Sequence, residues 1–406
     1  MRVGIEKLNV YPCTFSLEMA RLCEARGHDF ADIRDTMMID QRSVNAPWED
    51  PVTMAVNAAM PMLSDEDRAK IELVIVGSES GVDQEKPMST WVQRYLGLSS
   101  RVRNFEIKHA CYGATAGLRM ALGWIASGMA NGAKALVIAT DQSRMHLGKP
   151  WEFVMGAGAT ALLVSDRPDV LEIELGKSGI HTEEVSDLTR PTSRVETGNS
   201  ETSLLSYLDA LEGAFSHYIE KLPEPIDFDS YFAKNIYHAP FGGMTWRAHR
   251  ALLRRQGYKG DARAHFAKKS EHALTHLRRM GGTYGSATFI GLVGMLERAE
   301  DLAAGDRVSM FSYGSGSCAE FYSALIGPRA REVASTVKLG KQLDERYALT
   351  VREYEDIERE RTCWIDAGDF TPSTAGFDGW YDRRYRGKHL LEFRGIEDHY
   401  RKYGWS

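Results

Sequence analysis

The chain has 406 residues, of which 43% are hydrophobic, and its formal net charge is −6. This length can bury a large core, either as one α/β domain or as two halves, and the charge argues against nucleic acid as the main partner. No apolar run is long enough to span a bilayer, and the opening residues MRVGIEKLNVYP carry no export signal, so we expect no membrane segment.

Five cysteines are scattered along the chain, and none belongs to a CxxC pair. This pattern indicates neither a disulfide framework nor a zinc knuckle, and a reducing cytoplasm fits it best. The five are Cys13, Cys23, Cys111, Cys318 and Cys363.

Short apolar runs in the first half predict buried strands at residues 71–77, 135–140 and 159–165, with helical patterns between them. Alternating strands and helices of this kind are typical of an α/β fold whose sheet is covered on both faces. GAGATA at 156–161 nominally matches a dinucleotide fingerprint. We discount it because the chain continues there as a strand, which leaves the pyrophosphate no helix N-terminus.

The second half repeats this plan. We expect strands at 231–237 and 307–313, a small-residue turn opening an apolar helix at 281–296, and glycines leading into a strand at 315–326. Such a duplication divides the chain into residues 1–170 and 171–406. Two similar halves placed back to back give a five-layered αβαβα body with the active site at their junction.

The flanking segments are less regular. Residues 222–229, LPEPIDFD, look like a linker, and from about residue 333 the chain is charged and aromatic. Its last residues, 394–406, predict a strand followed by a helix that together cap the end of the molecule.

Cys111 lies where a short strand turns into a buried helix. This position puts its sulfur near a helix N-terminus, where free N–H groups and the helix dipole favour a nucleophilic thiolate. The alternative is a small apolar residue packed under the helix.

Glu79 follows the strand at 71–77, and His238 ends the strand at 231–237. A carboxylate at such a strand end points into the ligand crevice and becomes a general base if it is shielded from water. The alternatives are a solvated loop glutamate and a hydrogen-bonded core histidine. After His238, Pro240 and the pair Gly242–Gly243 predict a tight loop whose backbone approaches a ligand closely.

A thiol, a carboxylate and an imidazole at three strand ends form the set of groups that acyl chemistry needs. The glycine-rich stretch 312–317, SYGSGS, adds backbone N–H groups that, with that of Cys111, can form an oxyanion hole. A plain β-turn is an equal alternative for this stretch.

Two clusters of charged or ligating side chains remain. His265, His272 and His276 share a helix face, but without an HExxH motif or a third-ligand signal we expect a polar face and no metal. Arginines at helical spacing follow His238, and they form either a solvated face or a dock for a phosphopantetheine carrier, an acidic protein or a nucleotide. They are Arg247, Arg250, Arg254 and Arg255.

Several segments resemble the 3-hydroxy-3-methylglutaryl (HMG) synthase family of the thiolase superfamily over essentially the whole chain. They are GSESGVD, HACYGATAG, ATDQSR, HAPFGGM and FSYGSGSCAEFYSALI. The opening VGIEKLNVY, WEDPVTMAVNAAMPM, and the end of the chain from RYRGKHLLEF onward resemble the branch that installs β-branches in polyketide assembly lines. In HAPFGGMTWRAHR this chain has Gly-Gly-Met where primary-metabolism synthases typically carry a lysine that helps bind coenzyme A.

The resemblance implies roles for individual residues. Cys111 is similar to the acylated nucleophile, Glu79 to the general acid/base, and His238 to the histidine that polarises the acceptor carbonyl. Supporting positions are Asp83, Asp141, Asp187, Gly314 and Ser315, the last two in the oxyanion loop. Gly282 stands where the family often has asparagine, so an acceptor contact is either lost or supplied by Tyr284. The residues expected to contact acceptor or carrier are Gly242, Gly243, Arg247, Arg250 and Arg254.

We therefore expect a cytoplasmic homodimer that condenses an acetyl group from a donor acyl carrier protein with a β-ketoacyl group on a second carrier protein. Phosphopantetheine arrives with the carrier, or as coenzyme A, and no bound cofactor or metal is expected. The main alternative is a primary-metabolism synthase using acetyl-CoA and acetoacetyl-CoA. A non-catalytic scaffold and a cysteine hydrolase are the weaker alternatives.

Overall fold

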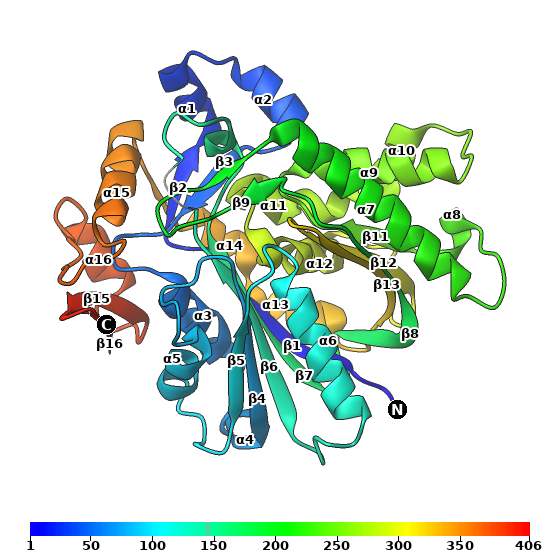
Figure 1. Ribbon diagram of the computed structural model, residues 1–406, viewed down its shortest axis with the longest axis horizontal. Helices are drawn as coiled ribbons and strands as arrows, with labels where there is room; N and C mark the ends of the chain where they lie inside the picture. Colours follow the sequence, from blue (N-terminus) through cyan, green and yellow to red (C-terminus); the bar gives the residue numbers. More distant parts are fainter. Residues whose placement is uncertain (144–145) are drawn as a thin grey trace.

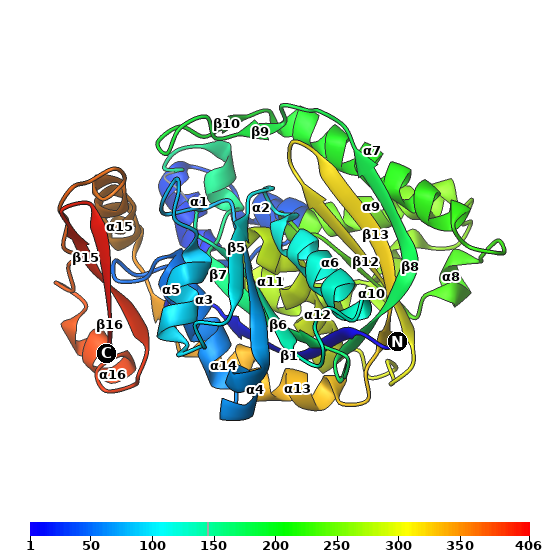
Figure 2. The same cartoon turned by 60° about the horizontal axis from the view of Figure 1, so that its bottom comes forward.

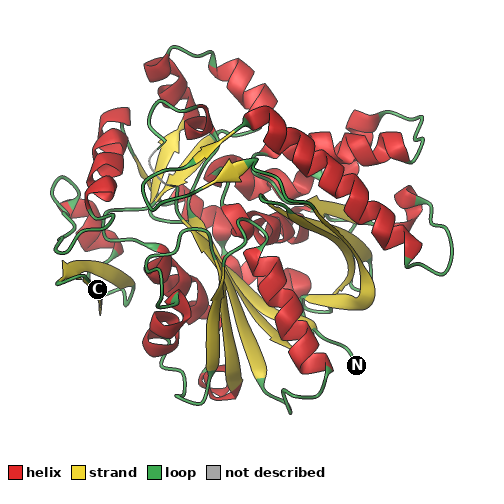
Figure 3. Ribbon diagram, viewed as in Figure 1, coloured by secondary structure: helices red, strands yellow, loops and turns green. Residues whose placement is uncertain are grey.

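The structure, a computed structural model, describes residues 1–143 and 146–406, and within them nine strands form one mixed sheet (Figures 1 and 3). Their order is β11–β12–β13–β8–β1–β7–β6–β4–β5. The strands are β1 (Gly4–Tyr11), β4 (Ile71–Gly77), β5 (Arg103–Ile107), β6 (Lys134–Asp141), β7 (Gly158–Ser165), β8 (Leu171–Thr182), β11 (Lys234–Tyr237), β12 (Arg307–Gly314) and β13 (Cys318–Ile326).

The sheet consists of two halves with the same pattern. In the first half β1, β7 and β6 are antiparallel neighbours, and β6, β4 and β5 are parallel; in the second, β8, β13 and β12 are antiparallel and β12 is parallel to β11. The halves join through two residue pairs between β1 and β8, Gly4 with Glu172 and Ile5 with Leu171. The expectation of two similar halves is confirmed, and the division at residue 170 stays a prediction.

Helices complete five layers, as Figure 2 shows. Helices α6 (Gly113–Ala126) and α12 (Ala287–Arg298) lie between the half-sheets and share one apolar core with both. Helices α3 (Pro51–Ala59) and α5 (Met88–Tyr95) cover the outer face of the first half. Helices α7 (Ser200–Glu220) and α9 (Gly242–Arg255) cover the second.

The layers follow from strand alternation. In β4, Leu73 and Ile75 face the shared central core while Val74 and Val76 face α3 and α5. Because successive side chains of a strand point to opposite faces, a strand that is apolar throughout must be covered twice. The predicted five-layered αβαβα arrangement is confirmed.

Smaller elements surround this body. The helices are α1 (Met19–Arg26), α2 (Phe30–Met37), α4 (Asp65–Lys70), α8 (Phe228–Tyr231), α10 (Ala262–Lys269), α11 (Leu274–Met280), α13 (Ala330–Val337), α14 (Leu339–Asp344), α15 (Val351–Cys363) and α16 (Asp378–Arg384). The strands are β2 (Phe15–Glu18), β3 (Gln41–Val44), β9 (Leu188–Thr189), β10 (Thr197–Gly198), β14 (Tyr347–Ala348), β15 (Leu391–Glu397) and β16 (Tyr400–Trp405). Single 3₁₀ turns occur at Met60–Met62, Pro150–Phe153, Glu271–Ala273 and Tyr284–Ser286. Among the residues described, none of the helices has the length and apolar character that crossing a membrane requires.

Two sequence predictions fail here. The chain end forms the antiparallel hairpin β15–β16, with no final helix, because Asp398 and His399 both adopt positive φ (47° and 66°) and turn the chain back within two residues. The strand predicted at 231–237 begins only at Lys234, since Phe228–Tyr231 is a short helix that the Asp227 side chain caps.

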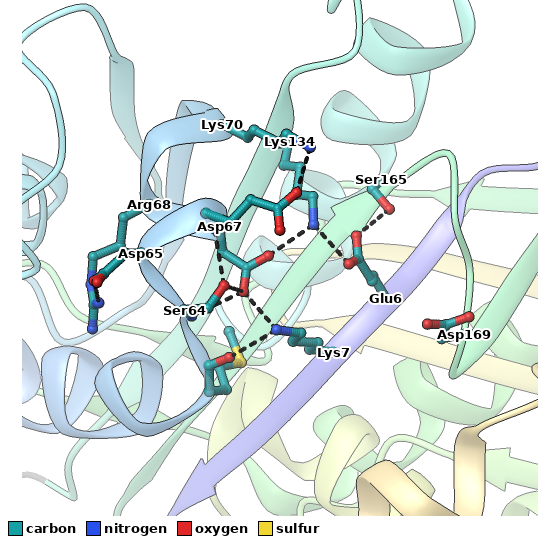
Figure 4. A network of polar contacts seen from close by, with 12 residues as sticks. Glu6, Lys7, Ser64, Asp65, Asp67, Arg68, Lys70, Lys134, Ser165 and Asp169 are labelled. Carbon is teal, nitrogen blue, oxygen red and sulfur yellow. Dashed lines mark hydrogen bonds and ion pairs between the residues drawn. The ribbon is translucent and has the colours of Figure 1, made fainter.

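A buried ion network fastens the first half at the start of β4 and β6, away from the strand ends that carry Glu79 (Figure 4). The Lys134 ammonium, 4% exposed, donates to Glu6 at 2.7 Å and to Asp67 at 2.8 Å. Lys7 donates to Asp67 at 2.6 Å, and the Ser165 hydroxyl donates to Glu6 at 2.6 Å. Every charge is thus paired, the condition under which burial is tolerated.

Candidate active site

Glu79 and Cys111 meet because β4 and α6 pack without any space between them. A Cβ at Gly77, the last residue of β4, would lie 2.3 Å from the backbone nitrogen of Ala114 in the first turn of α6. Glu79 leaves the strand two residues later, and Cys111 precedes the helix by two residues. The Cys111 thiol consequently lies 3.6 Å from the Glu79 carboxylate and donates to it.

Burial controls the charge of Glu79 and of the neighbouring Asp141. Burial first, and then the nearby Asp141 carboxyl, raises the pKa of Glu79 to about 8. Burial also raises the pKa of Asp141 to about 7, although Asp141 accepts hydrogen bonds from the Glu79 N–H (2.9 Å) and from the Ser78 and Ser80 hydroxyls. Two neighbouring buried carboxyls therefore resist double ionisation near neutral pH.

The same burial, with Glu79 and Asp141, raises the pKa of the Cys111 thiol well above its usual value. The predicted resting thiolate is therefore wrong, because desolvation outweighs the favourable end of α6. Cys111 rests as a thiol, and its activation requires a base. Glu79 is the carboxylate in contact with it.

His238 enters from the second half. Its backbone N–H donates to Phe311 O at 2.7 Å, and its carbonyl accepts from the Tyr207 hydroxyl at 2.7 Å. The imidazole is completely buried, and burial lowers its pKa to about 3, so the ring is neutral. Within the described part of the chain neither ring nitrogen has a hydrogen-bond partner, which leaves both for a bound molecule.

Cys111 and His238 line one cavity of about 440 Å³, whose walls are mostly apolar and include Trp151, Leu204 and Met244. Glu79 lines a second, more charged cavity of about 1100 Å³. Leu188, Glu196 and Ser315 line both cavities, so the Glu79–Cys111 contact stands where the two adjoin. This geometry brings the three predicted groups together, with an apolar space beside the sulfur and the imidazole.

Comparison with known proteins identifies the family to which this arrangement of residues belongs. Residues 2–169 match the model for the hydroxymethylglutaryl-coenzyme A synthase N-terminal region, and residues 255–403 match the C-terminal one. The polyketide biosynthesis 3-hydroxy-3-methylglutaryl-ACP synthase PksG of Bacillus subtilis is 39% identical over 371 residues, 87% of each chain. This chain belongs to the HMG-CoA synthase family.

Other relatives agree with this assignment. The hydroxymethylglutaryl-CoA synthase of Enterococcus faecalis is 33% identical over 89% of this chain and 92% of its own length. A crystal structure of the curacin biosynthetic pathway HMG synthase in complex with holo donor-ACP is 40% identical, covers all of both chains and superposes with a TM-score of 0.94. The expected thiolase-type fold of the HMG synthases is thereby confirmed.

The glycine-rich loop at 312–317, for which an oxyanion role was predicted, is fixed from two sides. Asp187 accepts from the Tyr313 hydroxyl at 2.8 Å and from the Gly316 N–H at 3.0 Å. A Cβ at Gly314 would meet His109 O at 2.6 Å and the Tyr112 backbone nitrogen at 2.8 Å. That close approach places the next residue, Ser315, at the cavity that Cys111 lines.

Three predicted site residues behave differently from expectation. Asp83 is exposed and accepts from the backbone N–H groups of Glu85 and Lys86, so it caps its own turn, and it lines only the larger cavity. A Cβ at Gly242 would lie 2.7 Å from Met38 Cβ, and one at Gly243 would lie 2.0 Å from Thr36 O. These two glycines admit the end of α2 and do not line the Cys111 cavity, and their predicted contact with acceptor or carrier stays a prediction.

Gly282 is also required by packing. A Cβ there would lie 2.2 Å from Pro240 O, so an asparagine does not fit this backbone. Tyr284, at φ 52°, lines the Cys111 cavity, and its buried hydroxyl has no partner among the described residues.

The arginines of α9 divide by position. Arg247 is half-buried and lines the Cys111 cavity with its guanidinium over Phe241, whereas Arg250 and Arg254 are exposed on the same helix face. Arg255 donates to Ser216 on the neighbouring α7.

The three histidines do not converge. His276 pairs with Glu297 at 2.6 Å, while His265 contacts His249 at 2.8 Å and Asp229 at 3.1 Å. Across residues 1–143 and 146–406, no group of three or more His, Cys, Asp or Glu side chains is arranged to hold a metal. Arg144, the last residue of the segment ATDQSR, lies outside the described residues.

Sequence reasoning missed Arg190, Glu196 and Tyr207. Arg190 and Glu196 occupy the loop between β9 and β10, whose two-residue strands give no hydrophobic period to read. Tyr207 lies on the buried side of α7, where it looks like any core aromatic residue. Only Asp187, three residues before Arg190, indicated this region.

Proposed function

We propose that this chain condenses an acetyl group, delivered by a donor acyl carrier protein, with the β-carbonyl of a ketoacyl chain on a second carrier protein. The product is an HMG-type β-branch of a polyketide intermediate. The convergence of Glu79, Cys111 and His238 carries the reaction class. The carrier assignment is supported by the 39% identity to PksG, against 33% to the synthase of Enterococcus faecalis, and by the likeness to a synthase crystallised with donor-ACP.

The first step loads the enzyme. Cys111 gives its proton to Glu79 and attacks the acetyl thioester, and the carrier thiol leaves with a proton, so acetyl-Cys111 forms and free carrier thiol is released. Burial raises the pKa of Glu79 to about 8 as well as the pKa of the Cys111 thiol, so the Glu79 carboxylate is a stronger base for this proton than an exposed glutamate would be. Backbone N–H groups at Cys111 and Ser315 are the proposed oxyanion donors.

The second step forms the carbon–carbon bond. Glu79 removes a proton from the acetyl methyl group, which its thioester acidifies without a metal. The enolate carbon attacks the β-carbonyl, whose oxygen becomes an alkoxide and then takes up the proton that Glu79 removed, which returns Glu79 to its ionised form. His238, neutral and unpartnered, donates to this oxygen from a water-poor cavity where such a bond is strong. Water then hydrolyses the Cys111 thioester and leaves a carboxymethyl branch on a tertiary alcohol.

The carriers are proposed to dock beside the mouth of the apolar cavity. Arg247, Arg250 and Arg254 present positive charge there to an acidic carrier surface or to the phosphate of phosphopantetheine. The buried Gly-Gly-Met start of α9 offers no lysine for coenzyme A. The proposal includes a cytoplasmic homodimer with no resident cofactor.

Acetylation of Cys111, followed by intact mass with acetyl carrier protein or acetyl-CoA as donor, tests this function. Faster loading from the carrier protein supports it, whereas preferred loading from acetyl-CoA favours a primary-metabolism synthase. Cys111→Ala should abolish the mass increase with either donor. If the wild-type chain loads from neither donor, the enzyme assignment is refuted.

Separate variants test the other two roles. Glu79→Gln should load acetyl more slowly than the wild type, because an amide cannot take the Cys111 proton, and should not condense. His238→Ala should load normally and condense about 100- to 1,000-fold more slowly, as expected for loss of one oxyanion donor. Normal condensation by the Glu79 variant would remove Glu79 from its role as acid/base.

A further inference from the structure

Among the described residues, Arg190 is the cation that contacts Glu79. One guanidinium nitrogen donates to the Glu79 backbone carbonyl, and another lies 3.8 Å from the Glu79 carboxylate. The Arg190 side chain is 16% exposed, so water screens this pair only weakly. A single side chain therefore holds both the main chain and the carboxylate of the proposed base.

Glu196 faces the same guanidinium from the other side of the loop. Its carboxylate accepts from two Arg190 nitrogens, and its side chain is 9% exposed. Behind it, His146 lies 3.5 Å away, and burial lowers the pKa of His146 to about 4, so this ring adds no charge near neutral pH. Arg190 thus lies between two carboxylates that compete for it.

Among the described residues, the groups that face Glu79 come from four parts of the fold. They are Cys111 before α6, Asp141 at the end of β6, Arg190 and Glu196 in the β9–β10 loop, and Tyr284 before α12. Tyr284 rests neutral because burial raises the pKa of its hydroxyl. Asp141 and Glu196 favour the protonated form of Glu79, and Arg190 favours the ionised form.

We propose that Arg190 is a positioning residue that holds Glu79 against Cys111 and favours the ionised form of this pair, and that Glu196 limits its effect. The inference rests on the proposed function only in treating Glu79 as the base. Its physical content is an electrostatic balance: removing Arg190 and removing Glu196 must move the titration of the Cys111–Glu79 pair in opposite directions. A residue that merely braces the loop would not produce opposite shifts.

The pH dependence of Cys111 alkylation by iodoacetamide measures this balance without any carrier or substrate. Peptide mapping by mass spectrometry isolates the Cys111 signal from that of the exposed Cys363. Arg190→Gln should raise the apparent pKa of alkylation by about one unit or more. Glu196→Gln should lower it, and Arg190→Lys, which keeps the charge, should stay close to wild type.

Arg194→Gln is the matched control, because Arg194 lies in the same loop but pairs with Asp366, with both side chains more than half exposed. Its alkylation profile should coincide with that of the wild type. Shifts of the same sign for Arg190→Gln and Glu196→Gln, or an unchanged Glu196→Gln profile, would overturn the proposal. If Arg190→Gln does not fold, Glu196→Gln and Arg190→Lys still decide the question.

A second measurement links the balance to turnover. In single-turnover condensation by preacetylated enzyme, the acidic limb of the pH profile should move up in Arg190→Gln and down in Glu196→Gln. If the two variants shift the alkylation pKa in opposite directions, as predicted, but the wild-type enzyme never loads acetyl, this inference stands and the proposed function fails. If the wild-type enzyme loads and condenses but the variants show no such shifts, the proposed function stands and this inference fails.

Discussion

Replacing Gly77 by alanine should separate Glu79 from Cys111, because the added methyl group has no space. An ideal Cβ there lies 2.3 Å from the Ala114 nitrogen and 2.4 Å from the Gly113 carbonyl carbon, whereas ordinary contact begins at 3.4 Å. Both neighbours are backbone atoms, so the start of α6 must retreat by about 1 Å. The 3.6 Å contact between the Cys111 thiol and the Glu79 carboxylate is then lost.

The expected cost has two parts. Overpacking of this kind destabilises a protein by about 1–3 kcal/mol. A displacement of about 1 Å between reacting groups slows a reaction by about 100-fold. Urea unfolding measures the first effect, and single-turnover condensation by preacetylated enzyme measures the second.

Gly123→Ala provides the control within the same helix. Gly123 is exposed on α6, and its added Cβ meets no heavy atom within 4 Å. Alanine should therefore stabilise the chain by up to about 1 kcal/mol through helix propensity and leave condensation unchanged. If Gly77→Ala condensed at the wild-type rate, close packing of β4 on α6 would not be what positions the pair.

Three further substitutions, the first paired with a control variant, test other parts of the fold. Lys134→Met removes the buried cation that Glu6 and Asp67 share, leaving Asp67 with Lys7 and Glu6 with the exposed Arg167, and should cost about 3 kcal/mol in urea unfolding, whereas Lys70→Met, which breaks an exposed pair, should cost less than about 1 kcal/mol. Burial lowers the pKa of His249 to about 3 from its ordinary 6.5, so stability should fall as the pH drops below about 6.5, and His249→Gln should reduce that fall in urea midpoints compared at pH 7 and pH 5. Gly282→Asn should destabilise the chain by about 1–3 kcal/mol or more because its Cβ collides with Pro240 O; an unchanged melting temperature would contradict this packing.

The strands that place the site were predictable because each apolar run stops where the chain turns. The run at 71–77 coincides with β4, and the predicted strand at 135–140 lies within β6. Side chains that follow such strands share one edge of a sheet, which is why Glu79 and His238 stood out. The terminal hairpin was missed because its turn, Asp398–His399, contains no glycine to signal positive φ.

The electrostatics of the site were less accessible from sequence. A helix terminus favours a thiolate by about 0.3–2 kcal/mol, whereas full burial of an ionisable group shifts its pKa by up to about 3–5 units. Only the folded chain shows that desolvation prevails at Cys111, although this residue keeps part of its surface exposed. Likewise, nothing in the spacing of Arg190 and Glu196 indicates that they flank Glu79.

The central helical layer has a consequence for how this molecule is assembled. Helices α6 and α12 belong to different halves, yet their side chains share one apolar core with strands of both. A fragment ending near residue 170 would expose the inner surface of its sheet to water, and so would its complement. The two fragments should therefore be insoluble or disordered when each is expressed alone, and they should regain structure when they are mixed. Each half repeats the architecture of the other, but neither half is stable by itself.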